Sequence, residues 1–217
     1  MTKKLVIFGG GGFAREVAWL VADINHTLPA DEIWDVVGFA EYSNERVGQF
    51  LNGIPIISLD DSNLDVADAF AIVAIGATNK REQAVNQARA LGLKFTSLIH
   101  PDVKLDKTSV QVGEGSVICA GNILTVNITV GNHVIINLDC TIGHDCVVED
   151  FVTISPGCHL SGYTTIRRGA YLGTGVVTVE KNVIGPGSVV GAGAVVVKDI
   201  PPNVTAVGIP AKPIKRL

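Results

Sequence analysis

The sequence has few charged residues of either sign and few cysteines, and each shortage excludes a class of protein. Of the 217 residues, 17 are Lys or Arg and 21 are Asp or Glu, which gives a formal net charge of -4. This balance argues against nucleic acid or an anionic membrane surface as the partner, because both require clustered positive charge. The longest apolar runs, such as "FAIVAIGA" from Phe70, are far shorter than the roughly 20 residues that cross a bilayer.

The four cysteines are too few to form a disulfide framework in a chain of this length. We expect them to be free thiols. The apolar run "LVIF" near the N-terminus gives way to glycines after four residues, which is too short for the core of a signal peptide. These features are typical of a soluble cytoplasmic protein.

Up to Pro101 the sequence alternates short apolar strands with helical patterns. Strands are expected at 4–8, 34–39, 69–76 and 93–100, and helices at 13–25 and 80–92. The first helix carries apolar residues at helical spacing, namely Ala14, Val17, Ala18, Val21 and Ile24. Such alternation predicts a small Rossmann-like α/β domain with a parallel sheet over residues 1–101.

From Val112 onward every sixth residue is aliphatic, with one exception. The series is Val112, Ile118, Leu124, Val130, Ile136, Ile142, Val148, Ile154, Leu160, Ile166, Leu172, Thr178, Ile184, Val190 and Val196. Fourteen of these fifteen residues are Val, Ile or Leu, whereas the register shifted by one position contains only two aliphatic residues in fifteen. The period is therefore a property of one register and not of a generally apolar segment.

A six-residue period indicates a short strand followed by a turn, so that three repeats close one triangular coil and the fifteen repeats form five coils. Strands of successive coils would stack about 4.8 Å apart. A small residue four places after the aliphatic one fits the interior beside it, as at Cys140, Cys146, Cys158, Ala170, Ser188 and Ala194. The pattern predicts an all-β parallel β-helix over residues 102–217.

The stretch "CTIGHDC" places a histidine and an aspartate between two cysteines of this repeat. Cys140 and Cys146 fall at the small interior position, so they are expected to pack as apolar residues rather than to bind metal. His144 falls at a corner, where side chains point outward, and the residue one coil later is Gly162. The spacing is consistent with a solvated surface histidine and equally with a histidine that has room for a ligand.

The whole chain resembles the sugar O- and N-acyltransferase family of hexapeptide-repeat proteins. This family includes sialic-acid O-acetyltransferase-like proteins and the N-acetyltransferases for nucleotide-linked amino sugars such as bacillosamine and perosamine. The matching stretches are "GGGGFAREVAWLV", "VVGF", "AIVAIGATNKR", "LIHPDV", "INLDCTIGHDC", "EDFVTISPGCHLSG" and "VGIPAK". The resemblance implies a left-handed β-helix, acetyl-CoA as co-substrate and a homotrimer with sites between subunits.

The resemblance also implies roles for individual residues. His144 would be the catalytic base, Asp145 its orienting carboxylate and Asn137 a neighbouring polar contact. A histidine suits this role, because it titrates near neutral pH and can accept the proton of an attacking amine or hydroxyl. Residues implied to contact acetyl-CoA are Thr153, where some relatives carry a histidine, and Gly162, Thr174, Ala192 and Lys212.

The glycine run "GGGGFA" fits the pattern G-x-G-x-x-A through Gly9, Gly11 and Ala14, directly after a strand and at the start of a helix. Such a turn lets backbone N–H groups approach a phosphate, although it also occurs in nicotinamide enzymes and as a purely structural turn. In the family that this chain resembles, the domain holds the nucleotide of the sugar substrate. The residues implied to bind it are Gly11, Gly12, Phe13, Glu41 and Tyr42.

The sequence and its resemblance therefore predict an acetyl-CoA-dependent N-acetyltransferase. Its acceptor would be the 4-amino group of a UDP- or GDP-linked amino-deoxysugar, used in bacterial surface glycans such as the O-antigen of lipopolysaccharide. The alternative is an O-acetyltransferase of sialic acid or a related sugar. A non-catalytic scaffold would not require His144, and a β-helical carbonic anhydrase would need converging histidines, whereas His133, His144 and His159 occupy different hexapeptide positions. No metal is expected.

Overall fold

The computed structural model describes residues 2–41, 44–58 and 68–217. The chain divides into two compact units, Met1–Pro101 and Asp102–Leu217. In the described part of the chain, none of the helices has both the length and the apolar character needed to span a membrane.

The N-terminal unit is built on a parallel sheet whose central strand is β1 (Lys3–Phe8). β1 pairs in parallel with β2 (Trp34–Ala40) on one side and with β5 (Phe70–Val73) on the other. Beyond these strands lie β4 (Ile54–Ile57) and β6 (Lys94–Phe95), each parallel to its neighbour. Because the chain leaves β1 toward β2 and later returns to the other side of β1, the carboxyl ends of β1 and β5 border a topological switch point.

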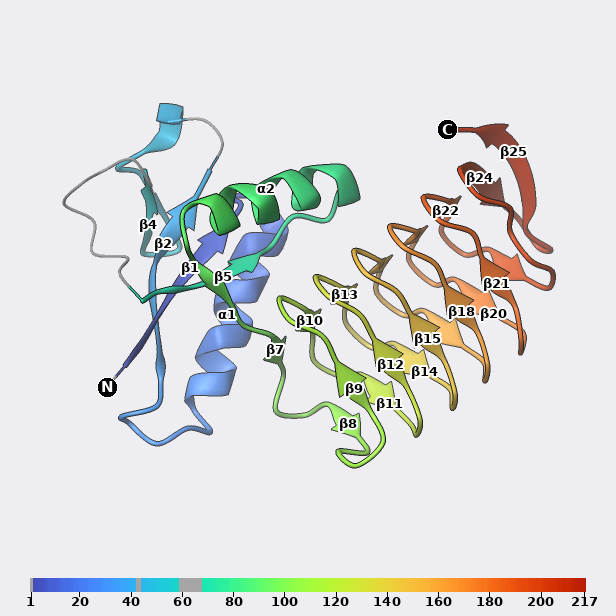
Figure 1. Ribbon diagram of the computed structural model, residues 1–217, viewed down its shortest axis with the longest axis horizontal. Coiled ribbons are helices and arrows are strands. Elements are labelled where there is room, and N and C mark those ends of the chain that lie inside the picture. Colours follow the sequence, from blue (N-terminus) through green and yellow to red (C-terminus); the bar gives the residue numbers. More distant parts are fainter. Residues whose placement is uncertain (1, 42–43, 59–67) are drawn as a thin grey trace. The chain divides into compact units, whose positions relative to one another are not determined.

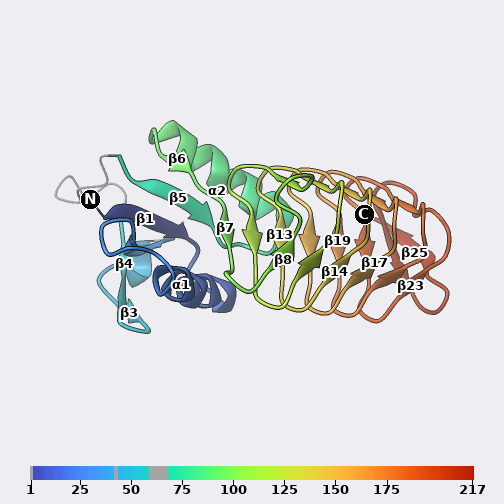
Figure 2. The same cartoon turned by 90° about the horizontal axis from the view of Figure 1, so that it is seen from below.

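Two helices cover opposite faces of this sheet (Figure 2). α1 (Gly12–Asn25) connects β1 to β2, and α2 (Thr78–Ala90) connects β5 to β6. The buried residues of α1 are Ala14, Val17, Leu20 and Val21. Two residues expected in its apolar face, Ala18 and Ile24, are only half-buried. The buried face of the helix includes Leu20 in their place.

Two local features of this unit differ from the sequence expectations. The strand expected at 93–100 is divided into β6 and β7 (Leu98–Ile99), because β6 pairs with β5 only as far as Phe95. An unexpected hairpin joins β3 (Phe50–Leu51) to β4, after a short 3₁₀ helix, η1 (Asn44–Arg46). Its turn residues, Asn52 and Gly53, both have positive φ (49° and 81°), as tight hairpins require.

The C-terminal unit is a parallel β-helix in which each six-residue repeat contributes one two-residue strand (Figure 1). The strands are β8 (Lys104–Leu105), β9 (Gln111–Val112), β10 (Val117–Ile118), β11 (Ile123–Leu124), β12 (Thr129–Val130), β13 (Ile135–Ile136), β14 (Thr141–Ile142), β15 (Val147–Val148), β16 (Thr153–Ile154), β17 (His159–Leu160), β18 (Thr165–Ile166), β19 (Tyr171–Leu172), β20 (Val177–Thr178), β21 (Val183–Ile184), β22 (Val189–Val190) and β23 (Val195–Val196). From β9 to β20, each strand pairs in parallel with the strand eighteen residues later, as Ile136 does with Ile154. β24 (Val204–Val207) and the antiparallel β25 (Lys212–Arg216) follow them.

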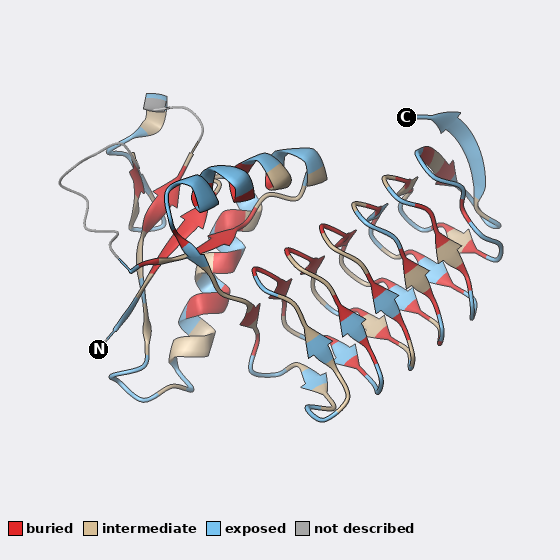
Figure 3. Cartoon of the chain, viewed as in Figure 1, coloured by how far each residue is buried: buried red, intermediate tan, exposed pale blue. Residues whose placement is uncertain are grey.

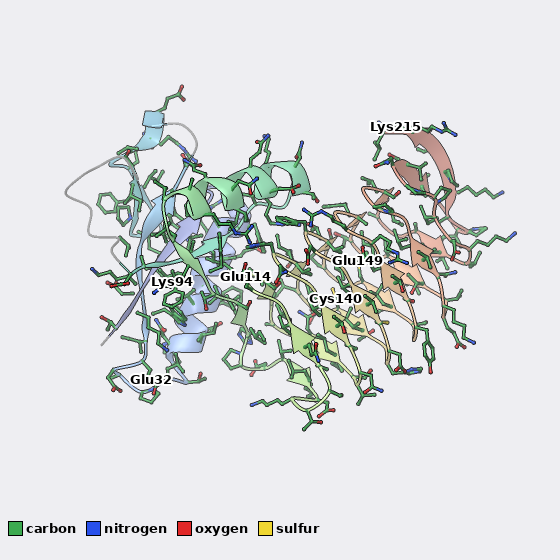
Figure 4. The ribbon with its side chains drawn as sticks, in the orientation of Figure 1. Glu32, Lys94, Glu114, Cys140, Glu149 and Lys215 are labelled. Atoms are coloured by element: carbon green, nitrogen blue, oxygen red, sulfur yellow. The ribbon has the colours of Figure 1, made fainter. Side chains whose placement is uncertain are left out.

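The interior of the β-helix is filled by the repeating aliphatic residues, as predicted. Fourteen of the fifteen are buried, and only Val112 is half-buried. The small interior positions are also filled as predicted, since Cys140, Cys146 and Cys158 are free thiols with no exposed surface. Figure 3 shows the resulting alternation of buried and exposed residues along the coils, and Figure 4 labels Cys140 among the strands.

Each coil turns at three corners, and the corners of successive coils stack on one another. We name each stack of corners after one of the strands that precede it. The β13 corner contains residues 137–139, 155–157, 173–175 and 191–193, and the β14 corner contains residues 125–127, 143–145, 161–163 and 179–181. The remaining corner follows β15. The third residue of each turn is left-handed, at Gly115, Gly121, Asn127, His133, Asp139, Asp145, Phe151, Gly157, Tyr163, Gly169, Gly175, Lys181, Gly187 and Gly193. Gly, Asn and Asp adopt this conformation readily, whereas bulky residues such as Tyr163 do so at a cost.

Candidate active site

The strongest candidate for chemistry is a histidine–carboxylate pair on the β14 corner. The chain leaves β14 at Ile142, and His144 and Asp145 follow after Gly143. His144 Nδ1 lies 2.8 Å from Asp145 Oδ2. The His144 side chain is 53% exposed and that of Asp145 is 31% exposed, so the pair is open to a ligand.

The environment of Asp145 determines which nitrogen of His144 is the base. The hydrogen bond from His144 is the main cause of a lowered pKa for the Asp145 carboxyl, and Asn127 and Tyr163 lower it further. At neutral pH the carboxylate is therefore ionised and can only accept hydrogen bonds. The proton must be on Nδ1 of the neutral imidazole, and Nε2 carries the lone pair that can accept a proton from a substrate.

The other side of the His144 imidazole is bordered by the next coil. A Cβ atom on Gly162 would lie 2.6 Å from His144 Cε1, so the ring occupies space that any other residue would fill. Tyr163 presents its ring edge-on to the imidazole, with the centroids 5.2 Å apart and the planes at 87°. Sequence reasoning identified Gly162 but missed Tyr163, although it lies eighteen residues after Asp145 and could have been found from that spacing.

Three further residues predicted for the site lie on a different corner. Asn137, Thr174 and Ala192 belong to the β13 corner, whereas His144 and Gly162 belong to the β14 corner. The side-chain oxygen of Asn137 accepts a hydrogen bond from the Leu138 N–H at 2.8 Å. Thr174 and Ala192 are exposed and occupy successive coils, as their spacing predicts. Within one chain, the predicted site residues thus form two separate groups.

The remaining two residues predicted to contact acetyl-CoA belong to neither group. Thr153 lies in β16 and is only 5% exposed. Lys212 is exposed at the start of β25, where it pairs with Val207. β25 also carries Lys215, which Figure 4 labels near the C-terminus.

A cleft of about 470 Å³ lies in the N-terminal unit at the switch point of the sheet. Its lining includes the glycine turn, the ends of β1, β2 and β5, and Lys80 and Gln87 of α2. Four of the five residues predicted to bind the nucleotide line this cleft, namely Gly11, Gly12, Phe13 and Glu41. The fifth, Tyr42, lies outside the described residues.

Two arginines form hydrogen bonds to residues that line this cleft, and sequence reasoning identified neither. Arg46 forms an ion pair with Glu41 and also donates to the Gly10 carbonyl at 3.2 Å. A Cβ atom on Gly10 would overlap the Glu41 carboxylate, so the glycine is needed for this arrangement. Arg81 is 1% exposed and donates to the Ile75 carbonyl at 2.8 Å, and burial lowers its pKa to about 10.

Within residues 2–41, 44–58 and 68–217, no group of three or more His, Cys, Asp and Glu side chains is placed to hold a metal ion.

Comparisons with known proteins relate this chain to acetyltransferases. A family model described as the PglD N-terminal domain matches residues 4–88. The acetyltransferase domain of PglB from Neisseria gonorrhoeae is 35% identical, with 98% of this chain and 100% of that chain covered and a TM-score of 0.85. A second structure of that domain is in complex with acetyl coenzyme A. The chain belongs to the hexapeptide-repeat acetyltransferase family.

Membership of this family confirms the predicted fold class, an α/β domain followed by a left-handed parallel β-helix. Another member, the perosamine N-acetyltransferase from Caulobacter crescentus, is 28% identical with a TM-score of 0.87, and 99% of this chain and 98% of that chain are covered. Its structure is a complex with CoA and GDP-perosamine. The galactoside O-acetyltransferase of Escherichia coli is 47% identical over 47 residues, or 22% of this chain. The match spans only 23% of the length of the curated relatives.

Proposed function

We propose that this protein transfers an acetyl group from acetyl-CoA to the 4-amino group of a UDP- or GDP-linked amino-deoxysugar. We further propose that it acts in the cytoplasm, in the synthesis of bacterial surface glycans such as O-antigen. The observation that carries the proposal is the His144–Asp145 pair, with Nε2 as the available base, on the fold of a sugar N-acetyltransferase.

The chemistry needs no covalent enzyme intermediate. The amine nitrogen of the sugar attacks the thioester carbonyl, and His144 Nε2 takes the proton that this nitrogen loses. Asp145 accepts from Nδ1–H and stabilises the imidazolium that forms. Collapse of the tetrahedral intermediate breaks the carbon–sulfur bond, and the proton passes to the departing thiolate of CoA. The products are the acetamido sugar and free CoA.

The N-terminal cleft is the proposed site for the nucleotide. Gly11 and Gly12 begin α1, whose first N–H groups have no partners within the helix and attract phosphate. Lys80 lines the same cleft and supplies a positive charge. The volume of about 470 Å³ is in the range of small-molecule sites. The complex of the Caulobacter relative with GDP-perosamine supports this assignment by analogy.

The two groups of β-helix residues are best explained by a homotrimer. If the β14 corner of one subunit packs near the β13 corner of the next, His144 of one chain meets Asn137 and Thr174 of its neighbour. The donor acetyl-CoA would then lie between subunits, near Thr153, Thr174 and Ala192, with Lys212 near its phosphates. A heterologous contact of this kind closes into a ring with threefold symmetry. A monomer in multi-angle light scattering would contradict the assembly.

A second candidate is O-acetylation of sialic acid or a related sugar. The match to a galactoside O-acetyltransferase favours it, and His144 would deprotonate a hydroxyl through the same contacts. The two candidates differ in the atom that attacks the thioester.

The deciding experiment is a thiol-release assay with acetyl-CoA and a panel of acceptors. The panel contains UDP-, GDP- and dTDP-linked 4-amino sugars, their 4-hydroxy counterparts and free sialic acid. Our proposal expects turnover of a UDP- or GDP-linked amino sugar and none of its hydroxy counterpart. Turnover of sialic acid alone would establish the second candidate instead.

A further inference from the structure

The β14 corner contains a column of residues that stack at intervals of eighteen. Asn127, Asp145, Tyr163 and Lys181 occupy the same place in successive coils, and all are left-handed, with φ of 54°, 58°, 59° and 64°. Asn and Asp are tolerated in this conformation because their short polar side chains bond locally. Tyr163 is a bulky residue, and a bulky residue with positive φ is strained. Glycine would satisfy the backbone better at this position, so replacing Tyr163 with glycine removes the side chain without straining the backbone.

The carboxylate of Asp145 is held by His144 of its own coil and by Asn127 of the preceding coil. Its Oδ2 accepts from His144 Nδ1 at 2.8 Å, and its Oδ1 accepts from Asn127 Nδ2 at 3.3 Å. The Asp145 backbone N–H donates to Val126 O at 3.1 Å, which fixes the start of the side chain. Each carboxylate oxygen therefore has a separate partner, and rotation of the carboxylate would break both hydrogen bonds.

Tyr163 restrains the pair from the following coil. Its backbone N–H donates to the His144 carbonyl at 2.9 Å, and its ring lies edge-on to the imidazole at 5.2 Å. Together with the Gly162 backbone, this ring limits rotation of His144 away from Asp145. A hydrogen bond from Tyr163 also contributes to the lowered pKa of the Asp145 carboxyl.

We infer that Asn127 and Tyr163 are positioning residues for the proposed base, acting from the coils before and after it. Asn127 fixes the rotation of the Asp145 carboxylate, and Tyr163 fixes the plane of the His144 imidazole. Neither touches the reacting atoms, since both act through Asp145 and His144. The inference rests on the proposed function, because it assumes that His144 Nε2 accepts the substrate proton.

Glycine substitutions in this column provide a matched test. Asn127→Gly and Tyr163→Gly remove the two side chains at positions where glycine suits the backbone, so both variants are expected to fold. Lys181→Gly is the control, because it makes the same backbone change one coil beyond Tyr163. Each full-length variant is assayed for kcat and for the KM of acetyl-CoA, and its melting temperature is recorded.

Asn127→Gly and Tyr163→Gly are expected to lower kcat by on the order of tenfold or more, since small misplacements of a base are costly. The KM of acetyl-CoA should stay within about twofold, because neither side chain is assigned to the donor. Their melting temperatures should equal or exceed that of the parent. Lys181→Gly should retain the parent kcat.

A direct readout of positioning is the tautomer of His144, measured from its ring ¹⁵N shifts at a pH where the ring is neutral. The parent should carry the proton on Nδ1, and Asn127→Gly and Tyr163→Gly should show a mixture of tautomers. Parent-like kcat and an unchanged tautomer in both variants would overturn the inference while leaving His144 as the base. Full activity of His144→Ala would instead overturn the proposed function on which it rests.

Discussion

The His144 imidazole fits on the β14 corner because Gly162, one coil later, has no side chain. A Cβ atom on Gly162 would lie 2.6 Å from His144 Cε1 and 2.7 Å from Nε2. Such separations are too short for packed atoms, so the ring would have to move. Since Asp145 holds the opposite side of the imidazole, any movement breaks the 2.8 Å hydrogen bond between them.

Replacing Gly162 with alanine is therefore expected to reduce activity sharply. The added methyl group displaces His144 and should lower kcat by on the order of a hundredfold. The fold should survive, because the contacting atoms belong to an exposed side chain. Thermal melting is compared for Gly162→Ala, His144→Ala and the double variant. In the His144→Ala background, the methyl group of Gly162→Ala should lower the melting temperature only slightly, because the imidazole is absent. An equal decrease in the parent and in His144→Ala would show that the methyl group contacts the backbone instead.

Asp145→Asn should impair the enzyme at every pH. The pKa of the Asp145 carboxyl is lowered from its ordinary 3.8, so the group contributes to stability above that pH and loses this contribution only as the pH falls further. It therefore stays ionised throughout the neutral range. An asparagine amide can donate to Nδ1 and select the wrong tautomer, which is expected to lower kcat by roughly 10³- to 10⁴-fold. A variant with the kcat of the parent across the neutral range would show that Asp145 does not orient the imidazole.

The register of the β-helix could be read from the sequence because its interior accepts little except aliphatic residues. The period beginning at Val112 placed His144 on a corner and Cys140 in the interior, and both placements are confirmed. The same arithmetic separates Asn137 from His144, since they belong to consecutive six-residue repeats and therefore to different corners. The family resemblance grouped them in one site, which a single chain does not form.

Contacts between side chains on neighbouring coils could not be read in the same way. The eighteen-residue spacing places Tyr163 one coil after Asp145, but it does not show that the tyrosine ring lies edge-on to His144. Arg46 reaches Glu41 and the Gly10 carbonyl from a short helix that carried no sequence signal. Such pairings depend on side-chain length and direction, which periodicity does not contain.

Thr178, the one polar residue of the aliphatic series, leads to a prediction about stability. Its hydroxyl accepts from the Ser161 N–H at 3.1 Å and bonds Thr164 Oγ1 at 3.0 Å. Thr178→Val restores the repeat and adds a buried methyl group worth about 0.8 kcal/mol. It also removes the acceptor of the Ser161 N–H, which costs about 1–3 kcal/mol, whereas Thr164 Oγ1 keeps its hydrogen bond to the Ser161 carbonyl at 2.7 Å. The loss is larger, so the variant should unfold at lower urea concentration than the parent, with Thr178→Ser as the control that keeps the hydroxyl.

Gly11→Ala tests the nucleotide site without disturbing the fold. Gly11 precedes α1 with φ of -86°, and a Cβ atom there would meet nothing within 4 Å. The melting temperature should therefore equal that of the parent. In the cleft, the methyl group would occupy space that a phosphate needs, so the KM of the nucleotide sugar should rise at least several-fold while that of acetyl-CoA stays the same. An unchanged KM for the nucleotide sugar would show that its phosphate does not bind at the glycine turn.

The most direct test of the central claim is the turnover number of His144→Ala with acetyl-CoA and the amino sugar that the parent uses. The kcat of this variant is expected to fall by several orders of magnitude, while binding of acetyl-CoA and the melting temperature stay close to those of the parent. A variant that acetylates the amino sugar at the parent rate would contradict the assignment of His144 as the base.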